Sequence, residues 1–331
     1  MFSWTAIART GERFSDFGPY VPSVNDAGLV AFQAAVRDGG SGVFTGSGGA
    51  LTEVVGPGEL AAVTSHPDLN DAGAISFYGD LPRVGQGVFL FQHGELETIA
   101  QTLGAFAGIG PLGPTINDGG SVAFRADRPS TRSGIFVGDA ATVAVVAQTG
   151  DRWSRFHGLP VINRPGTVVF RADRTDGVEG IYAGGPGGST RTVAETGELF
   201  ETLAPFPSLN DQGTVAFAAT LRAGGAGIFT SEEGGLTRIT DPDGAFESCR
   251  GALITNAGAV VSIATPRGGS LGLFAGPDPV ADRILGLGDP LLGSIVADFA
   301  ANPVSVNGAG QIAIRARLAD GTQLMLRAEP G

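Results

Sequence analysis

The chain has 331 residues, a formal net charge of −12, no lysine and a single cysteine, Cys249. An acidic protein without a basic stripe is a poor match for a phosphate backbone, so we expect no nucleic-acid partner. One cysteine excludes a disulfide within the chain, and the longest apolar run, near residues 140–147, is too short to span a bilayer.

In chain order, Val24–Phe32 is the first of seven copies of one repeat, in which an Asn-Asp-x-Gly-like turn leads into an apolar strand. The repeat glycines are Gly28, Gly73, Gly120, Gly166, Gly213, Gly258 and Gly310, with spacings of 45, 47, 46, 47, 45 and 52 residues. A period of this length is typical of a four-stranded propeller blade.

The first repeat predicts how each unit folds. A short apolar strand ends at Val24, and Asn25–Gly28 turns the chain, because Asn and Asp tolerate the left-handed conformation and Gly supplies a positive φ. Further strands are expected at residues 29–36, 42–46 and 51–55. The blades predicted in this way cover residues 19–58, 66–104, 113–150, 159–197, 206–242, 252–288 and 303–329.

The two ends of the chain fit together. A fourth strand often ends in Ala-x-Thr-Gly plus an acid, as at residues 147–151, and the same pattern stands at residues 8–12, before any first strand. The last repeat stops after a third strand at residues 323–327. We therefore predict an all-β, single-domain, seven-bladed propeller over residues 1–331, with residues 1–11 supplying the fourth strand of the last blade. The final spacing of 52 predicts an insertion near residues 291–301, in the loop entering blade 7.

The unit Asn-x-x-Gly-x-x-Ala-Phe is complete at residues 25–32, 117–124 and 210–217. It resembles a bacterial tandem-repeat family known by that motif. The resemblance implies β-propeller-like repeats in proteins that are typically exported and surface-anchored, and it implies no reaction and no catalytic residues. We recognise no signal peptide and no anchor in this sequence, so we expect a soluble protein without membrane insertion and leave its localisation open.

The repeated Asn-Asp turns need an explanation of their own. Propeller topology places them on one face, whereas the loops between second and third strands and the loops between blades share the other face, where we expect the ligand site. Calcium needs six to eight oxygens that converge on one point. We expect turns on separate blades to lie too far apart for that, and we predict structural turns, no metal site and no cofactor.

Arginines follow the repeat in blades 3 and 4. Candidate ligand-binding residues are Arg125 and Arg128 in the first of these blades, and Arg171 and Arg174 in the second. Such a cluster could bind a carboxylate through paired hydrogen bonds. The alternative is an Arg-Asp ladder that ties neighbouring blades together, and the frequency of structural ion-pair networks favours the ladder.

The loop entering blade 4 carries Arg152, Trp153, Arg155 and His157, a combination suited to stacking on a sugar ring. We name His157, His66 and Tyr20 as candidate catalytic residues. Around a channel, His, Tyr and Arg could carry out β-elimination on a uronate: Arg would neutralise the carboxylate, His would take the proton and Tyr would donate one. The favoured alternative is that Trp153 and Phe156 fill the gap between blades and His157 caps a turn.

The remaining motifs are weaker. The loop of Asp241 and Asp243, with Glu247, could bind a cation, although a turn is the favoured interpretation. We expect Cys249 to be packed and inert and His93 to be solvated.

The function that these features favour is a monomeric ligand-binding module, with variable loops around the channel mouth that hold a glycan or a small carboxylated molecule. Two alternatives stay open. One is a lyase or cyclase that uses His, Tyr and Arg at the mouth, and the other is a structural or surface-display protein. Fold does not decide between them.

Overall fold

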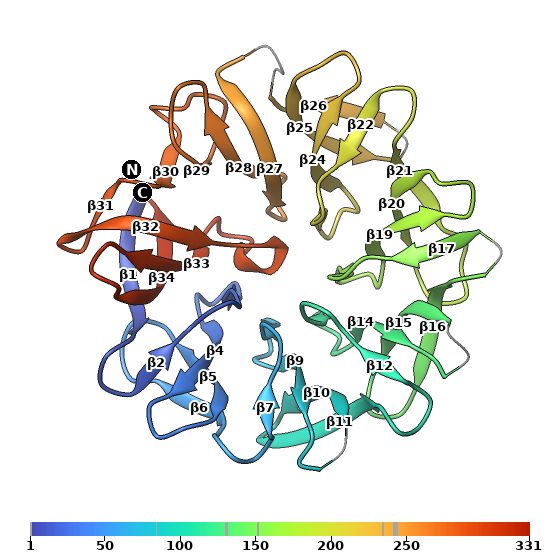
Figure 1. The fold of residues 1–331 in the computed structure, drawn as a ribbon, viewed down its shortest axis with the longest axis vertical. Helices are drawn as coiled ribbons and strands as arrows, with labels where there is room; N and C mark the ends of the chain where they lie inside the picture. The colour runs from blue at the N-terminus through green and yellow to red at the C-terminus, as the bar shows by residue number, and fades with distance from the viewer. Residues whose placement is uncertain (1, 84, 130–131, 151, 234, 241–243) are drawn as a thin grey trace.

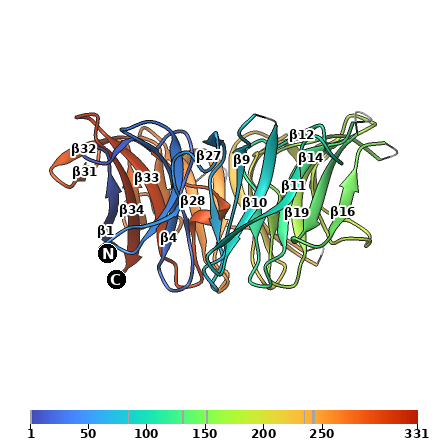
Figure 2. The ribbon, with the colours of Figure 1, turned by 90° about the horizontal axis from the view of Figure 1, so that it is seen from below.

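The computed structural model describes residues 2–83, 85–129, 132–150, 152–233, 235–240 and 244–331. Seven sheets stand around a central channel like the blades of a propeller (Figure 1). Seen from the side, the strands run across the thickness of a flat ring (Figure 2). The prediction of an all-β, seven-bladed propeller is confirmed. No helix in the described ranges has the length and apolarity needed to cross a membrane.

Blade 1 sets the pattern for most of the ring. Its inner strand is divided into β2 (Phe14–Asp16) and β3 (Ser23–Val24), and both pieces pair with β4 (Val30–Val36). Outside β4 lie β5 (Ser41–Gly46) and β6 (Thr52–Val55). The repeat predicts β3 to β6 but not β2. Proline has no N–H to donate to a sheet, so the prolines between the two pieces interrupt the inner strand.

The other blades follow in chain order. Blade 2 holds β7 (Ala62–Val63), β8 (Asp68–Leu69), β9 (Ile75–Asp80), β10 (Gln86–Gln92) and β11 (Glu95–Gln101). Blade 3 holds β12 (Gly108–Ile109), β13 (Thr115–Ile116), β14 (Val122–Asp127), β15 (Ser133–Gly138) and β16 (Val143–Gln148). Blade 4 holds β17 (Trp153–Phe156), β18 (Val161–Ile162), β19 (Val168–Arg174), β20 (Glu179–Gly184) and β21 (Arg191–Glu195). Blade 5 holds β22 (Phe200–Leu203), β23 (Ser208–Leu209), β24 (Val215–Leu221), β25 (Ala226–Glu232) and β26 (Gly235–Arg238). Blade 6 holds β27 (Phe246–Ile254), β28 (Val260–Pro266), β29 (Gly272–Phe274) and β30 (Arg283–Gly286).

The last blade is closed by the N-terminus, as predicted. Its strands β32 (Ser294–Ala300), β33 (Ile312–Leu318) and β34 (Gln323–Pro330) are completed by β1 (Phe2–Arg9), which pairs antiparallel with β34. The inserted residues form a hairpin between β31 (Pro290–Leu291) and β32, followed by the short 3-10 helix η1 (Pro303–Ser305).

The core of each blade explains a second regularity of the sequence. In six copies a glycine is followed two residues later by an aromatic, as in Gly134 and Phe136. The ring of Phe136 stacks on that of Phe124, with 5.6 Å between centroids. A Cβ atom on Gly134 would lie 2.9 Å from the ring of Phe136 and 3.0 Å from the carbonyl oxygen of Ala147. The glycine therefore leaves the space into which the aromatic ring folds.

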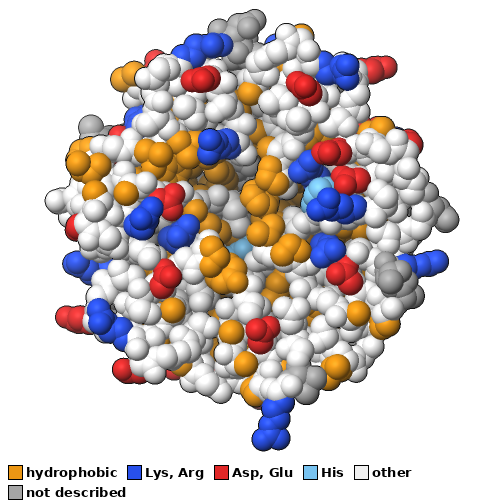
Figure 3. All heavy atoms as spheres, in the orientation of Figure 1, with side chains coloured by type: hydrophobic (Ala, Val, Ile, Leu, Met, Phe, Trp, Pro, Cys, Tyr) orange, Lys and Arg blue, Asp and Glu red, His pale blue; other side chains and the backbone are white. Residues whose placement is uncertain are grey.

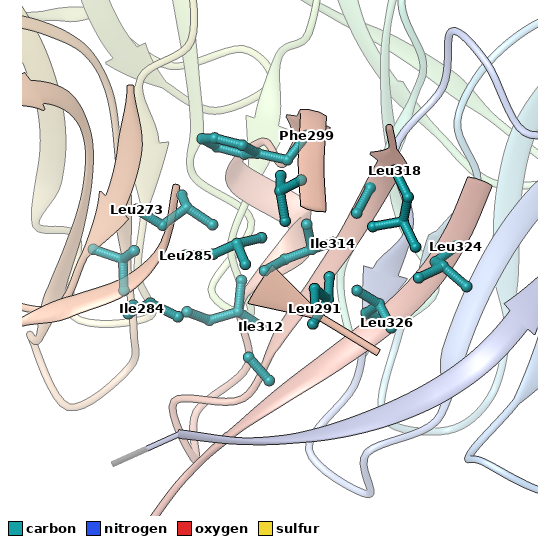
Figure 4. Packing of buried hydrophobic residues seen from close by; sticks show 14 of the residues in the cluster. Leu273, Ile284, Leu285, Leu291, Phe299, Ile312, Ile314, Leu318, Leu324 and Leu326 are labelled. Carbon is teal, nitrogen blue, oxygen red and sulfur yellow. The ribbon is translucent and has the colours of Figure 1, made fainter. Parts of the chain in front are cut away.

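Blade 7 departs from this rule and has an aliphatic core. Leu324 and Leu326 stand where other copies have glycine and an aromatic. They belong to a cluster with Ile312 and Ile314 that continues to Leu285 of blade 6 (Figure 4). Blades 6 and 7 are thus joined by aliphatic side chains packed across their junction.

The repeat asparagines link the blades to one another. The Oδ1 of Asn25 accepts a hydrogen bond from the N–H of Leu29 within its own turn, at 3.0 Å, while its Nδ2 donates to the carbonyl oxygen of Asn70 in the next blade, at 3.2 Å. The amides that donate to the next turn in this way are those of Asn25, Asn70, Asn117, Asn163, Asn210 and Asn307. Thr255 takes this place in blade 6 and has no amide to donate. In the other six blades asparagine thus shapes the turn and joins it to its neighbour.

Candidate functional site

The Asn-Asp turns surround one mouth of the channel, which we call the turn face. Neighbouring turns touch between blades, so they lie closer together than expected: the N–H of Asp26 donates to Oδ1 of Asp71 at 2.8 Å. Together they enclose a hollow of about 150 Å³. The apolar residues that line it are Val24, Leu69, Ile116, Val161, Ile162, Leu209, Ile254, Pro303, Val304 and Val306. The inner strands therefore narrow the channel to a small pocket.

Arg164 bridges the acidic rim of this pocket. Its guanidinium lies 2.7 Å from a carboxylate oxygen of Asp118, and 3.7 Å from those of Asp71 and Asp211. Burial and the nearby carboxylates of Asp26 and Asp118 raise the pKa of Asp71. Across the described ranges, no group of three or more His, Cys, Asp and Glu side chains is arranged to hold a metal ion. The carboxylates accept backbone N–H groups and pair with Arg164, so the turns keep their structural interpretation on these grounds.

The opposite, loop-rich face carries a larger hollow between blades 2 and 3, of about 570 Å³. Its lining includes Tyr20, Gln86, Arg125 and Asp127, together with the segment Gly108–Leu112. Figure 3 shows this face, where hydrophobic side chains surround a central hollow and groups of basic and acidic side chains, one with a histidine, lie beside it. Two of the residues selected from the sequence, Tyr20 and Arg125, thus meet in one place.

Arg125 makes most of its hydrogen bonds to the protein itself. Nε donates to the carbonyl oxygen of Phe156 in blade 4 at 3.2 Å, and Nη1 donates to that of Gly110. Nη2 contacts Asp127 at 3.1 Å and the hydroxyl of Ser133 at 3.4 Å. Arg125 therefore ties blade 3 to blade 4 through the carbonyl oxygen of Phe156, whereas its ion pair with Asp127 lies within β14. A guanidinium has five N–H donors, and these four hydrogen bonds leave one.

The other candidate arginines lie away from this hollow. Arg171, in the matching position of blade 4, pairs with Glu179. Arg174 pairs with Asp176 and Glu195 at the outer part of that blade, and Arg128 lies 5.3 Å from the ring centroid of Phe136. They do not form one cluster with Arg125. Their contacts serve their own blades.

The loop entering blade 4 is mostly a core element. Trp153 is only 6% exposed and packs on Tyr182, with 4.4 Å between ring centroids. Arg152 lies over the indole at 4.4 Å and donates to Thr190, while Arg155 is exposed on β17. The structure therefore places the indole between strands, where it offers little surface for a sugar.

The three candidate catalytic residues occupy different surroundings. Nε2 of His157 lies 2.8 Å from Oδ1 of Asp173 at the rim of the loop-rich face. His66 is fully buried, and burial lowers its pKa to about 4. Burial, followed by the charge of Asp80, raises the pKa of Tyr20, which lines the hollow between blades 2 and 3. Neither histidine belongs to the lining of that hollow.

Sequence reasoning missed the segment Gly108–Leu112 and three polar lining residues, Thr64, Tyr78 and Gln86. Tyr78 holds the same place after its repeat glycine as Arg125, and this register was the available signal. Thr64 lies in the break of an inner strand, which the repeat does not reveal.

The weaker motifs have mixed outcomes. Asp241 and Asp243 lie outside the described residues. Burial raises the pKa of the Cys249 thiol, which lies 3.9 Å from the Thr240 hydroxyl in partly buried surroundings. His93 is exposed in the turn between β10 and β11.

Comparisons with known proteins agree with this architecture. The chain belongs to a Family of unknown function (DUF7453), whose model matches residues 6–324. No curated protein sequence matches it. An oligogalacturonate lyase in complex with manganese is similar in structure, with a TM-score of 0.63 and 11% identity over 99% of this chain and 98% of that one.

Two further solved structures share the fold. An oligogalacturonate lyase from Vibrio parahaemolyticus gives a TM-score of 0.60 at 10% identity, covering 99% of this chain and 98% of that one. A puromycin-hydrolyzing peptidase from Mycobacterium tuberculosis also gives 0.60, at 15% identity, but this chain spans only 48% of it and is covered over 90% of its own length. At such identities the likeness concerns the fold alone.

Proposed function

We propose that this propeller is a binding module for a small carboxylated ligand, in the first place an oligosaccharide that contains uronate units. The site is the hollow between blades 2 and 3. The observation that carries the proposal is its lining, which combines a guanidinium, a phenol, an amide and a carboxylate from Arg125, Tyr20, Gln86 and Asp127.

Each group has a role that matches such a ligand. The remaining N–H of Arg125 suits a carboxylate oxygen, and the amide of Gln86 can both donate to and accept from sugar hydroxyls. The phenol of Tyr20 is protonated at neutral pH, as for any tyrosine, and burial raises its pKa further, so it can donate a hydrogen bond. The carboxylate of Asp127 can accept a hydrogen bond from a sugar hydroxyl. The volume of about 570 Å³ lies within the range of small-molecule sites.

The likeness to two oligogalacturonate lyases makes uronates the first ligands to test. Those proteins share the propeller fold over nearly the whole chain. Shared fold does not transfer their substrate, so the argument for this chain rests on the chemistry of its own hollow.

The test is calorimetric titration with galacturonate oligomers and with the matching neutral oligomers. We expect binding of the uronates, and Gln86→Ala and Arg125→Gln should weaken it about 10- to 100-fold, the loss of one hydrogen bond to a charged group. Gln92→Ala is the matched control, because Gln92 lies on the same strand β10 but outside the hollow. Urea unfolding of each variant separates a lost contact from a lost fold, which matters for Arg125.

Failure would take a clear form. If no uronate oligomer binds, or if it binds Gln86→Ala and Arg125→Gln as tightly as the original protein, the proposal falls. Equal binding of neutral and acidic oligomers would remove the role given to Arg125.

A second candidate function rests on the pair His157 and Asp173. A carboxylate at 2.8 Å orients an imidazole for proton transfer, and the backbone carbonyl of the adjacent Phe156 is the group that Arg125 binds. On this basis His157 would remove a proton from a uronate bound at the rim. Incubation with polygalacturonate, followed by absorbance of the unsaturated product, tests this. Turnover that is lost in His157→Ala supports the enzyme, and unchanged turnover in that variant rejects it.

A further inference from the structure

Two polar side chains of blade 2, at or near the hollow between blades 2 and 3, have atoms without hydrogen-bond partners among the described residues. His66 is 3% exposed, and its Nε2 has no hydrogen-bond partner among the described residues. The hydroxyl of Thr64, two residues earlier, is buried and is likewise without a partner in the described part of the chain. Thr64 lines the hollow. Buried polar groups are nearly always paired, so two orphans on one short segment call for an explanation.

Leu112 and Gly113 of blade 3 lie against His66, and Leu112 also lines the hollow. The N–H of His66 donates to the carbonyl oxygen of Leu112 at 3.3 Å. A Cβ atom on Gly113 would lie 2.5 Å from Cε1 and Nε2 of His66, so the imidazole occupies the place of the missing side chain. Leu112 lines the hollow and is 37% exposed. Its φ of +79° is uncommon for leucine and costs backbone energy.

This arrangement is specific to blades 2 and 3. Four residues before the repeat asparagine, blades 1, 4, 5 and 7 carry an apolar residue, as in Val21, Leu159 and Phe206, and blade 6 carries Gly251 at the same distance before Thr255. Blade 2 carries the imidazole of His66 there, and blade 3 carries Gly113. The polar group and the space beside it therefore occur together at the one junction that also forms the hollow.

We propose that His66 and Thr64 form an inner subsite of this hollow, covered by Leu112 in the unliganded protein, which binds hydroxyl groups of the carbohydrate. The inference rests on the proposed function and names a second part of the same site. A neutral imidazole and a hydroxyl together offer donors and acceptors that match neighbouring sugar hydroxyls. Burial lowers the pKa of His66 to about 4, which keeps the imidazole neutral at pH 7.

The first experiment needs no ligand. The chain has three histidines, His66, His93 and His157, so modification by diethyl pyrocarbonate can be assigned by peptide mapping. Leu112→Gly removes the cover, and glycine adopts the positive φ readily. We expect His66 to react several-fold faster in this variant. Leu103→Gly is the matched control, since Leu103 has a φ of +73° and is 75% exposed but does not line this hollow. Equal rates at His66 in both variants would overturn the role of Leu112 as a cover.

The second experiment uses galacturonate oligomers. We expect His66→Phe to bind them about 10-fold more weakly, the effect of one lost hydrogen bond, and His66→Gln to recover part of the affinity because it keeps polar atoms. Urea unfolding shows whether each variant is folded. A folded His66→Phe that binds as tightly as the original protein refutes the subsite and leaves the hollow standing. Absence of binding by the original protein refutes the proposed function and the subsite with it.

Discussion

Asp68 is a buried carboxylate at the junction of blades 2 and 3. It is 6% exposed, and its two oxygens accept from the N–H groups of Leu69 at 3.0 Å and Ile116 at 2.8 Å. Burial raises its pKa to about 7, with a further contribution from the charge of Asp118. Blades 3 and 5 have a hydroxyl at this position. The Thr115 hydroxyl accepts a hydrogen bond from the N–H of Ile162 at 3.1 Å, and the Ser208 hydroxyl accepts one from the N–H of Ile254 at 3.2 Å. Asp68→Ser is therefore the substitution that the fold itself suggests.

The expected result is a change in how stability depends on pH. Between pH 4 and pH 7 the folded protein holds a proton on Asp68 that the unfolded chain releases. The contribution of this group to the free energy of unfolding is therefore fully present below pH 4 and is lost as pH rises through 7. The slope is about 1.4 kcal/mol per pH unit. Over this window the free energy of unfolding of Asp68→Ser should gain roughly 3 to 4 kcal/mol relative to that of the original protein.

Urea unfolding at pH 4.5 and pH 7.5, followed by the fluorescence of Trp4 and the buried Trp153, measures this difference. His66 contributes in the opposite direction, since its lowered pKa means that stability is lost as pH falls from 6.5 towards 4. His66 is present in both proteins, so its contribution cancels in the comparison. If the two proteins differ by the same free energy at both pH values, Asp68 does not titrate as its burial requires and the reasoning is refuted.

Three further predictions concern the scaffold and the cysteine. Gly134→Ala should destabilise the protein by about 1–3 kcal/mol through overpacking against Phe136, whereas Gly49→Ala, with nothing within 4 Å of its Cβ, should be close to neutral in the same urea titration; equal effects would contradict the packing argument. Thr255→Asn should supply the missing amide between blades 6 and 7 and raise the free energy of unfolding by about 0.5–1.5 kcal/mol, whereas Thr255→Asp, which keeps an acceptor for the N–H of Ala259 but has no amide to donate, should show no such gain. Cys249 should react slowly with a thiol reagent at pH 7 and faster as pH rises, because burial raises its pKa; rapid reaction at pH 7 would show an accessible thiolate.

The number of blades and the closing strand were predictable because the repeat recurs at a nearly constant spacing along the chain. Spacing between glycines counts blades, and the shared Thr-Gly pattern at residues 8–12 identifies β1 as the strand missing from the last blade. The first half of each inner strand was not predictable in this way. Pieces as short as β7 and β12, followed by prolines, have too few residues to show an alternating pattern.

The site was predicted only in part, because it depends on distances between blades. Tyr20 and Arg125 were identified as polar residues in loops, and the structure brings them together at one hollow. Trp153 and His66 were also identified, but their burial is decided by which neighbouring strand they face, and the sequence of one repeat does not contain that information. The same limit explains why the Asn-Asp turns were expected to be far apart.

The series of asparagine amides also gives the ring a direction and a weak point. Each described amide points to the following blade, and the series stops at Thr255, whose junction with blade 7 is held by aliphatic packing. Apolar packing restrains the sliding of one blade against the next less than an oriented hydrogen bond does. In hydrogen exchange, amides of β30 and β32, which flank this junction, should therefore open before those of other blades, and strain on the ring should be released there rather than at the strand that joins its two ends.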